Sequence, residues 1–469
     1  MSVHFPSIPR SLSRRRLLAQ LGSGFGLLGL AKLKAATAGP FDPKPPHYEP
    51  RVKNVIFLMM NGGWSQVDTF DPKPALTRYD GKPMPGGTPK TDADDGRVGT
   101  LMKSPFRFHK HGQSGIEVSE LFPQVGGIID DFCVIRSMHT NVPNHEPGLF
   151  MINCGALQPG RPSMGSWITY GLGTENRNLP GFVVLCPGVP TVGPPLWNSA
   201  FLPAVYQGTH IHTEETDPKK LIRYIRNERF THDVQRRQLN LLERLNRRHL
   251  ATREGDTQLE ASIETMETAF RMQMQAPEVF DIAQETETLR DSYGNSDFGR
   301  ACLMARRMVE HGVRIVQVYF GKVQPWDSHG DIMAHKRLSA EADPAIATLI
   351  RDLKARGLFD ETLVIVGSEF GRTPAVQLQR NSQLTNGRDH NSLGFTVLLT
   401  GGGVRGGMTY GATDEFGYTA VEKPVHVHDL HATVLHLLGL DHTKLTYHYS
   451  GRDFRLTDVH GNVLSEILV

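Results

Sequence analysis

The strongest constraint on the fold is a series of five short apolar runs, each bounded by glycine or polar residues. The first run, 54–60, reads NVIFLMM and is followed by Asn61-Gly62-Gly63. A continuous apolar run that stops at a glycine turn is typical of a strand buried on both faces, as in a parallel sheet. The other four runs cover residues 132–136, 313–320, 362–367 and 394–400.

Helical periodicity appears between these runs, at about 298–311, 338–356 and 426–438. The alternation predicts an α/β fold, a doubly wound sandwich with a mostly parallel central sheet. Residues 215–290 differ, because apolar residues recur every three or four positions among many charges. We predict a helical insertion there. Membrane binding by this segment is the weaker interpretation, because charges of both signs alternate along it.

The N-terminal segment 1–38 has the pattern of an export signal. Ser13-Arg14-Arg15-Arg16 precedes a glycine-diluted apolar stretch, and Ala36-Thr37-Ala38 forms a cleavage site. Adjacent arginines before a weakly apolar stretch are typical of a twin-arginine signal, with a general secretory signal or an uncleaved anchor as alternatives. A span needs about 20 apolar residues. We expect a periplasmic or extracellular protein without a stable membrane span after cleavage.

Charge argues against a nucleic-acid partner. The formal charge of +2 includes six basic residues and no acidic residue within 1–38, so the rest of the chain has an excess of acidic residues. It contains no basic block of the kind that binds nucleic acid. The Pro-rich residues 39–51 are expected to be a linker to one domain, 52–469. Four cysteines without a C-x-x-C pair are too few for a disulfide scaffold, although one disulfide stays open.

Polar residues gather next to all five runs, where ligands bind in open α/β sheets. They are Asn61, Ser65, Asp68 and Asp71 after the first run, His139, Asn144, His145 and Glu146 after the second, Asp327, Ser328, His329 and His335 after the third, Ser368, Glu369 and Arg372 after the fourth, and Arg388, Asp389, His390 and Asn391 just before the fifth.

Their Asp, Glu and His side chains predict a site for one or two divalent metals. Zinc takes histidine and carboxylate ligands, whereas magnesium, calcium and manganese favour carboxylate oxygen, so the identity of the metal stays open. The candidate ligands are Asp68, Asp327, His329, Glu369, Asp389 and His390. Taken singly, such an Asp is as often a helix cap, and such a His is more often a structural residue.

Two further groups of histidines are weaker candidates. His210, His212 and Glu214 have metal-like spacing in a polar loop. Histidines 426, 428, 431 and 436 lie at helical spacing among Leu and Val, which favours packing or capping roles. The nucleophile elbow G-x-S-x-G, the P-loop and H-E-x-x-H are absent from the sequence.

Several blocks, taken in order, resemble the alkaline phosphatase and sulfatase superfamily, and within it the bacterial family named for domain of unknown function 1501. The blocks are NVIFLMMNGGWSQVDTFDPKP, WDSHGD, SEFGRTP, GRDHN and GRDFRLTDVHG, and they span most of the chain outside the helical insertion. The resemblance implies an alkaline-phosphatase-like sandwich with a metal site at the sheet edge. It also implies that Asp327, His329, Asp389 and His390 supply ligands, as Asp and His do in alkaline phosphatases.

The active-site positions depart from the sulfatase pattern. In sulfatases the first strand ends in two metal-binding Asp residues, and here Asn61 and Gly62 stand there. The sulfatase nucleophile is the Cys or Ser of C-x-P-S-R, and the corresponding text here is His145-Glu146-Pro147-Gly148-Leu149. A formylglycine mechanism is therefore not expected.

Two functions are compatible with these residues. The first is an exported, metal-dependent hydrolase of sulfate or phosphate esters, acting on an anionic ester or a sulfated polysaccharide. In it His145 would be a nucleophile or a general acid and base, and Arg372 and Arg388 would hold the anionic ester. The second is a catalytically degenerate protein of the same fold that binds a glycan or a partner protein.

Overall fold

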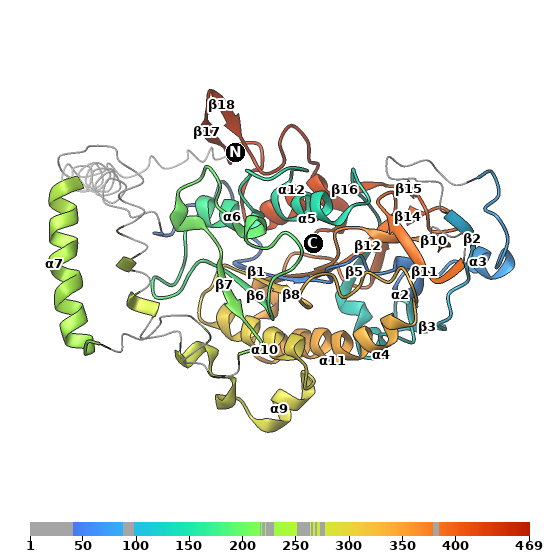
Figure 1. Cartoon of the computed structure of the whole chain (residues 1–469), viewed down its shortest axis with the longest axis horizontal. Helices are drawn as coiled ribbons and strands as arrows, with labels where there is room; N and C mark the ends of the chain where they lie inside the picture. The colour runs from blue at the N-terminus through green and yellow to red at the C-terminus, as the bar shows by residue number, and fades with distance from the viewer. Residues whose placement is uncertain are drawn as a thin grey trace, which may run out of the picture.

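The computed structural model of the chain describes residues 41–87, 98–215, 217, 221, 229–250, 263, 266, 267, 270–272, 277–378 and 384–469. The predicted export signal, 1–38, lies outside the described residues, as does much of the predicted insertion at 215–290. Helices cover both faces of a central sheet (Figure 1). The four cysteines are buried and free, so no disulfide forms among them.

The central sheet has nine strands. Along one path the order is β13 (Met408–Tyr410), β5 (Phe132–His139), β12 (Phe395–Gly401), β9 (Thr362–Gly367), β1 (Asn54–Met59), β8 (Ile315–Tyr319), β6 (Phe182–Cys186) and β7 (Thr209–His212), and β16 (Val425–His426) also pairs with β5. The five predicted runs form β1, β5, β8, β9 and β12. The mostly parallel α/β sheet is therefore confirmed.

Strand β12 runs against its neighbours. It pairs antiparallel with β5 and with β9, whereas β1 pairs parallel with β8 and β9. An apolar run does not encode strand direction, so this feature could not be taken from the run itself. As a consequence, the segment just before β12 lies at the sheet edge where β1, β8 and β9 end.

The core lies on both faces of the sheet, because side chains alternate along each strand. In β1, Ile56 and Leu58 pack into one cluster, and Val55 and Phe57 into the other. The first cluster includes residues of α10 (Asp297–Glu310) and α11 (Ala334–Ala355), and the second those of α5 (His145–Cys154), α6 (Met164–Leu172) and α12 (Val427–Leu437). Helices α10, α11 and α12 confirm the three predicted helical patterns.

A small antiparallel sheet extends from the end of β9. Its order is β11 (Leu384–Asn391), β10 (Gly371–Leu378) and β2 (Val98–Leu101). In its register Arg372 lies opposite His390. This sheet therefore places residues 388–391 beside the carboxyl end of β9.

The remaining elements are short or peripheral. They are α2 (Gln66–Thr69), α3 (Pro74–Arg78), α4 (Pro123–Gly126), α7 (His232–Leu250), α9 (Glu287–Ser292), and the paired strands β3 (Phe108–His111) with β4 (Ile116–Ser119), β14 (Ala412–Thr413) with β15 (Ala420–Glu422), and β17 (Tyr447–Tyr449) with β18 (Arg452–Phe454). Helix α7, in the predicted insertion, stands at the left of Figure 1. Among the described helices, none combines the length and hydropathy that a membrane crossing requires.

Candidate metal centre

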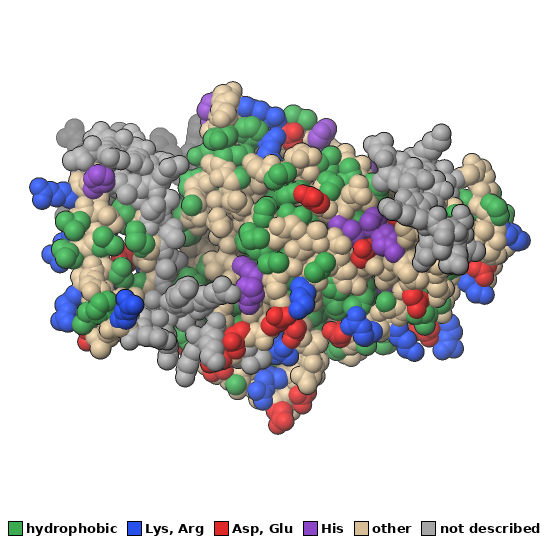
Figure 2. Space-filling view, viewed as in Figure 1, with side chains coloured by type: hydrophobic (Ala, Val, Ile, Leu, Met, Phe, Trp, Pro, Cys, Tyr) green, Lys and Arg blue, Asp and Glu red, His purple; other side chains and the backbone are tan. Residues whose placement is uncertain are grey.

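Four side chains from three segments meet at the carboxyl edge of the sheet. His145 begins α5 after β5, Asp327 and His329 follow β8, and His390 lies on β11. One ligand atom of each lies within 4.8 Å of those of the other three. The side chains are 9% to 30% exposed, so the cluster opens to solvent. Figure 2 shows histidine and acidic side chains gathered on this face, in the region of β12 and α5.

Asp327 Oδ1 lies at the centre of the cluster. His329 Nε2 is 2.8 Å from it, and His145 Nε2 and His390 Nε2 are each 3.2 Å from it. The Nε2 atoms of His329 and His390 are 2.9 Å apart. Three imidazoles thus direct the same ring nitrogen toward one carboxylate oxygen.

This donor set fits a divalent metal ion. Tetrahedral ligands with metal bonds of 2.0–2.1 Å lie about 3.3 Å apart, which is close to the separations in the cluster. His145 Nε2 is buried and forms no well-directed hydrogen bond, although Asp327 Oδ1 is 3.2 Å away. A buried nitrogen with a lone pair and no donor is the state that a bound cation would satisfy.

The electrostatics of the cluster keep its carboxylate charged. Burial alone would raise the pKa of Asp327, but the adjacent rings of His145, His329 and His390 and the charge of Arg372 hold it far below its ordinary range. Burial lowers the pKa of His390 to about 3, against the opposing effect of Asp327. His390 is therefore neutral near pH 7, as a metal ligand must be. For His145, burial acts to lower the pKa, but the neighbouring carboxylates of Asp327 and Glu369 raise it overall.

A second layer of residues orients two of the rings. The buried Glu369 accepts from the Gly62 amide at 2.9 Å and from the Ser368 hydroxyl at 2.9 Å, and its Oε1 lies 2.7 Å from His145 Nδ1. Gln377 Oε1 lies 2.5 Å from His329 Nδ1. Such partners fix the orientation of ligating or catalytic histidines.

Two predicted metal ligands therefore lie one layer further out. Glu369 contacts the far nitrogen of His145 instead of the cluster centre. Asp389 Oδ1 lies 3.7 Å from His329 Nδ1 and accepts from the His390 amide. Both were predicted to be metal ligands because the sequence assigns residues to loops but does not give the directions of their side chains. Gln377 was not predicted at all, since it lies along β10, beyond the loop at the end of β9.

Arg372, which was predicted to hold an anionic ester, is engaged by protein groups in this structure. Its side chain is fully buried, and all three nitrogens have protein partners. Nε donates to Gly63 O at 2.7 Å, Nη1 to Arg388 O at 3.3 Å, and Nη2 to Asp327 Oδ1 at 2.6 Å and to Gly62 O. Arg372 therefore fixes Asp327 against the turn after β1 and offers no free donor to an ester.

Asp68 and Arg388 also differ from their predicted roles. Both side chains are fully buried, and Arg388 Nε and Nη2 lie 2.7 and 3.1 Å from the two carboxylate oxygens of Asp68. Ser65 Oγ donates to the same carboxylate at 2.5 Å. Burial would raise the pKa of Asp68, but Arg388 and Ser65 lower it overall. The two residues satisfy one another, and Asp68 does not belong to the four-residue group at the sheet edge.

The end of β1 is shaped by close packing. Asn61 Nδ2 donates to Gly321 O at 2.9 Å and to Val323 O at 2.8 Å, which ties β1 to the loop after β8. Gly62 has φ +114°, and a Cβ there would lie 2.7 Å from the Asp327 amide nitrogen. No larger side chain fits beside Asp327, so an aspartate of the sulfatase type is sterically excluded at this position.

The other candidate histidines do not form a further metal group within the described ranges. The rings of His210 and His212 are 4.3 Å apart, but Glu214 pairs with Lys322 at 3.1 Å. His426 caps α12, and the Nε2 atoms of His428 and His431 each lie 2.9 Å from a backbone carbonyl, Gly155 O and Ile152 O. The packing and capping roles predicted for the C-terminal histidines are confirmed for these three.

Comparison with known proteins finds a family match and distant structural neighbours. The family model described as protein of unknown function (DUF1501) matches residues 52–468. No curated protein matches the chain. A sulfatase from Pseudoalteromonas sp. is 13% identical over 88% of this chain and 70% of its own, with a TM-score of 0.33.

Two further solved structures are similarly distant. A phosphonate monoester hydrolase from Silicibacter pomeroyi is 12% identical over 82% of this chain and 73% of its own, with a TM-score of 0.33. An alkaline phosphatase from the Antarctic bacterium TAB5 is 12% identical over 77% of this chain and 94% of its own, with a TM-score of 0.30. The chemistry of the cluster therefore has to rest on its own geometry.

Proposed function

The chain belongs to the DUF1501 family, and we propose that it is an exported, metal-dependent hydrolase of sulfate or phosphate esters. The observation that carries the proposal is the convergence of three imidazole nitrogens on Asp327 Oδ1 at the carboxyl edge of the sheet. Open α/β sheets bind their ligands at this edge. The cluster is also partly open to solvent, as a catalytic site requires.

We assign the metal to Asp327, His329 and His390. Asp327 Oδ1 and the Nε2 atoms of His329 and His390 lie 2.8 to 3.2 Å from one another. By contrast, His145 Nε2 forms no well-directed hydrogen bond with Asp327. Two imidazoles and one carboxylate favour zinc, with manganese next, over the oxygen-preferring calcium and magnesium. Zinc sites with three protein ligands are the catalytic kind, because they keep a position for water or substrate. A divalent ion held there would polarise the ester and acidify a water.

His145 is then the acid–base residue. Its Nδ1 donates to Glu369 Oε1 at 2.7 Å, which leaves Nε2 as the acceptor that faces the cluster. In that position it takes a proton from the attacking water and returns it to the departing alcohol oxygen. His145 also begins α5, whose N-cap residue Asn144 provides no side-chain cap, and a helix N-terminus favours an anionic ester.

Export is part of the same proposal and rests on the sequence of residues 1–38. The arginine pair, the short apolar stretch and the Ala36-Thr37-Ala38 site support a twin-arginine signal. We propose that the chain works in the periplasm or outside the cell, where sulfated polysaccharides are accessible substrates.

A second function is favoured by one feature of the cluster. If His145 is a fourth metal ligand, a tetrahedral ion would be fully coordinated by protein, which is typical of structural sites. Arg372 and Arg388, which were expected to hold the ester, are committed to protein partners. In this case the chain would be a noncatalytic protein that binds a glycan or a partner protein.

The variant His145→Ala distinguishes the two functions. The chain would be loaded with zinc or manganese and assayed on p-nitrophenyl sulfate and p-nitrophenyl phosphate. We expect His145→Ala to keep its metal while turnover falls about 10²- to 10⁴-fold, the range for loss of a general acid or base. His109→Ala is the matched control, because His109 is exposed on β3. Loss of the metal from His145→Ala, with no turnover by the parent chain, would favour the binding protein.

A further inference from the structure

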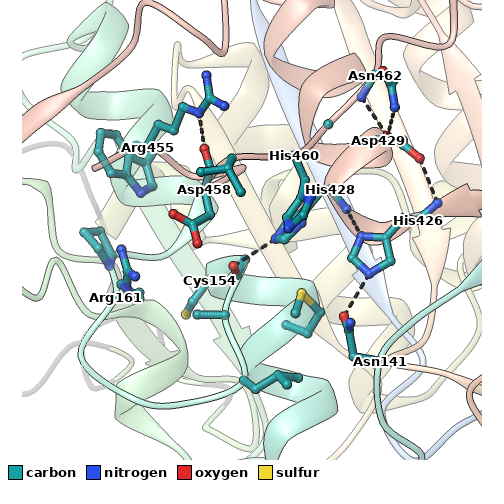
Figure 3. Close-up of a pocket in the computed structure, with 18 of the residues that line it drawn as sticks. Asn141, Cys154, Arg161, His426, His428, Asp429, Arg455, Asp458, His460 and Asn462 are labelled. Carbon is teal, nitrogen blue, oxygen red and sulfur yellow. Dashed lines mark hydrogen bonds between the residues drawn. The ribbon is translucent and has the colours of Figure 1, made fainter. Parts of the chain in front are cut away.

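A pocket of about 700 Å³ lies apart from the metal cluster (Figure 3). Its walls come from the C-terminal half of α5 with the loop after it, the start of α12, and residues 455–462. None of the four cluster residues lines it, although Asn141 on its wall is only four residues before His145. The volume is in the range of small-molecule sites.

Two arginines from distant segments lie on one side of this pocket. Figure 3 shows Arg161 and Arg455 there, with Asp458 between them. The guanidinium of Arg161 lies 4.2 Å from the centre of the Phe454 ring, and Arg455 donates through Nε to the Asp458 carbonyl. Neither arginine has an ion-pair partner among the described residues. An arginine held through Nε or by stacking keeps its terminal N–H groups for a bidentate acceptor.

The two carboxylates of the pocket are already engaged. Asp458 forms an ion pair with Arg452. Asp429 accepts from the His426 amide at 2.9 Å and from the backbone and side-chain nitrogens of Asn462 at 2.6 and 3.1 Å. Asp429 accepts only from neutral N–H groups and keeps its charge, and Asp458 also acts electrostatically on Arg161. What the two arginines offer is therefore terminal N–H donors on one side of the pocket, and an anionic group is the acceptor that suits them.

The opposite wall offers hydrogen-bonding groups and flat rings. The rings of His428 and His460 are parallel within 10°, with centres 5.4 Å apart. His428 Nε2 lies 2.9 Å from Gly155 O and so carries the proton, which leaves Nδ1 as a buried acceptor without a partner. Leu157 and Phe201 supply apolar surface. Acceptors beside apolar surface suit a ring that carries hydroxyl groups.

We propose that this pocket binds an acidic sugar, meaning a pyranose with a carboxylate or a sulfate. Arg161 and Arg455 would hold the anionic group, and the wall with His428 and His460 would face the ring and its hydroxyls. The assignment does not depend on the metal cluster or on hydrolysis, since no cluster residue lines the pocket.

Isothermal titration calorimetry on the full chain tests this site with four probes. Glucuronate and glucose 6-sulfate carry the two kinds of anion, glucose carries none, and benzoate has an anion without hydroxyls. We expect both acidic sugars to bind, and glucose and benzoate to bind at least tenfold more weakly. Glucose binding as tightly as glucuronate would overturn the role of the arginines, and equal benzoate binding would overturn the sugar.

Variants separate loss of binding from loss of folding. Arg161→Gln and Arg455→Gln should each weaken glucuronate binding at least tenfold, whereas Arg78→Gln, which removes an exposed arginine elsewhere, should leave it unchanged. Val459 is 70% exposed at the pocket, so Val459→Trp should block binding without lowering the melting temperature. Unchanged affinity in the arginine variants, or no binding of either acidic sugar by the folded chain, would overturn the proposal.

Discussion

The histidines of the metal cluster differ from those of α12 in what their ring nitrogens face. In the cluster, His145, His329 and His390 direct Nε2 toward one carboxylate oxygen. In α12, His428 and His431 direct Nε2 toward backbone carbonyls. The first arrangement presents lone pairs to a shared point, whereas the second satisfies each ring locally.

Closeness along the chain does not indicate which histidines converge. Residues 426, 428 and 431 are close together in the chain, whereas the three cluster histidines are spread from 145 to 390. The sheet topology brings the distant ones together, because the carboxyl ends of parallel strands share one edge. The direction of each ring nitrogen therefore decides the chemistry of a histidine group, and spacing does not.

The largest expected difference between the two groups is in metal binding. His329→Ala and Asp327→Ala should each lower metal affinity by more than about 100-fold. This loss is larger than the one expected when a residue that only orients a ligand is removed. His428→Ala should keep the metal content of the parent chain, because its ring bonds to a backbone carbonyl. Elemental analysis of the three variants measures this. Equal metal loss in His428→Ala and His329→Ala would show that the cluster histidines and the α12 histidines do not differ in metal binding.

The same contrast applies to two aspartates that each face a buried arginine. Asp327 also faces three histidines, whereas both oxygens of Asp68 are engaged by Arg388. Asp68→Asn should cost about 3–5 kcal/mol of unfolding free energy, because it leaves a buried charge unpaired. Urea unfolding gives this value, and the metal content should not change. A variant that loses metal but keeps its stability would return Asp68 to the metal site.

A smaller effect is expected behind the cluster, at Gln377. Gln377→Ala removes the partner of His329 Nδ1 and should weaken metal binding by about 10- to 100-fold. Competition with a chelator of known affinity measures the change. Gln113→Ala serves as the control, because Gln113 is exposed. Identical affinities in the two variants would show that the ring of His329 needs no outer support.

The smallest expected effect is a pH dependence of stability from α12. Burial lowers the pKa of His431 from its ordinary value of 6.5 to about 3. Between these values the unfolded chain binds a proton that the native chain does not, so stability is complete above pH 6.5 and falls as the pH decreases. One such group contributes a slope of up to about 1.4 kcal/mol per pH unit.

The variant His431→Leu isolates this contribution. Urea unfolding of the variant and the parent chain would be compared from pH 6.5 to pH 4, and we expect a shallower loss of stability in the variant. Because its hydrogen bond to Ile152 O is also lost, the variant should be less stable at every pH, and only the slope reports titration. Parallel slopes would show that His431 is protonated in the native chain.

Much of the fold was predictable because a strand that is buried on both faces of a sheet appears in the sequence as a continuous apolar run. The runs at 54–60 and 362–367 became the adjacent central strands β1 and β9. The direction of β12 was not predictable, since an apolar run has the same composition in either direction. The residues before β12 were nevertheless placed at the correct edge, and its antiparallel direction explains why they reach it.

The site was predictable at the level of loops and not at the level of atoms. Loops after β8 and before β12 were expected to meet, and they supply Asp327, His329 and His390. The pairing of Asp68 with Arg388 was missed, because either residue alone could serve a ligand or an anion. The place of Glu369 behind His145 depends on a side-chain direction that no sequence pattern encodes.

The most direct test of the central claim is the metal content of the parent chain, purified without chelator and measured by elemental analysis. We predict one equivalent of zinc or manganese per chain, bound tightly enough to survive gel filtration. A folded chain that holds no metal, and takes up none when zinc and manganese are added, would contradict a metal centre at Asp327, His329 and His390.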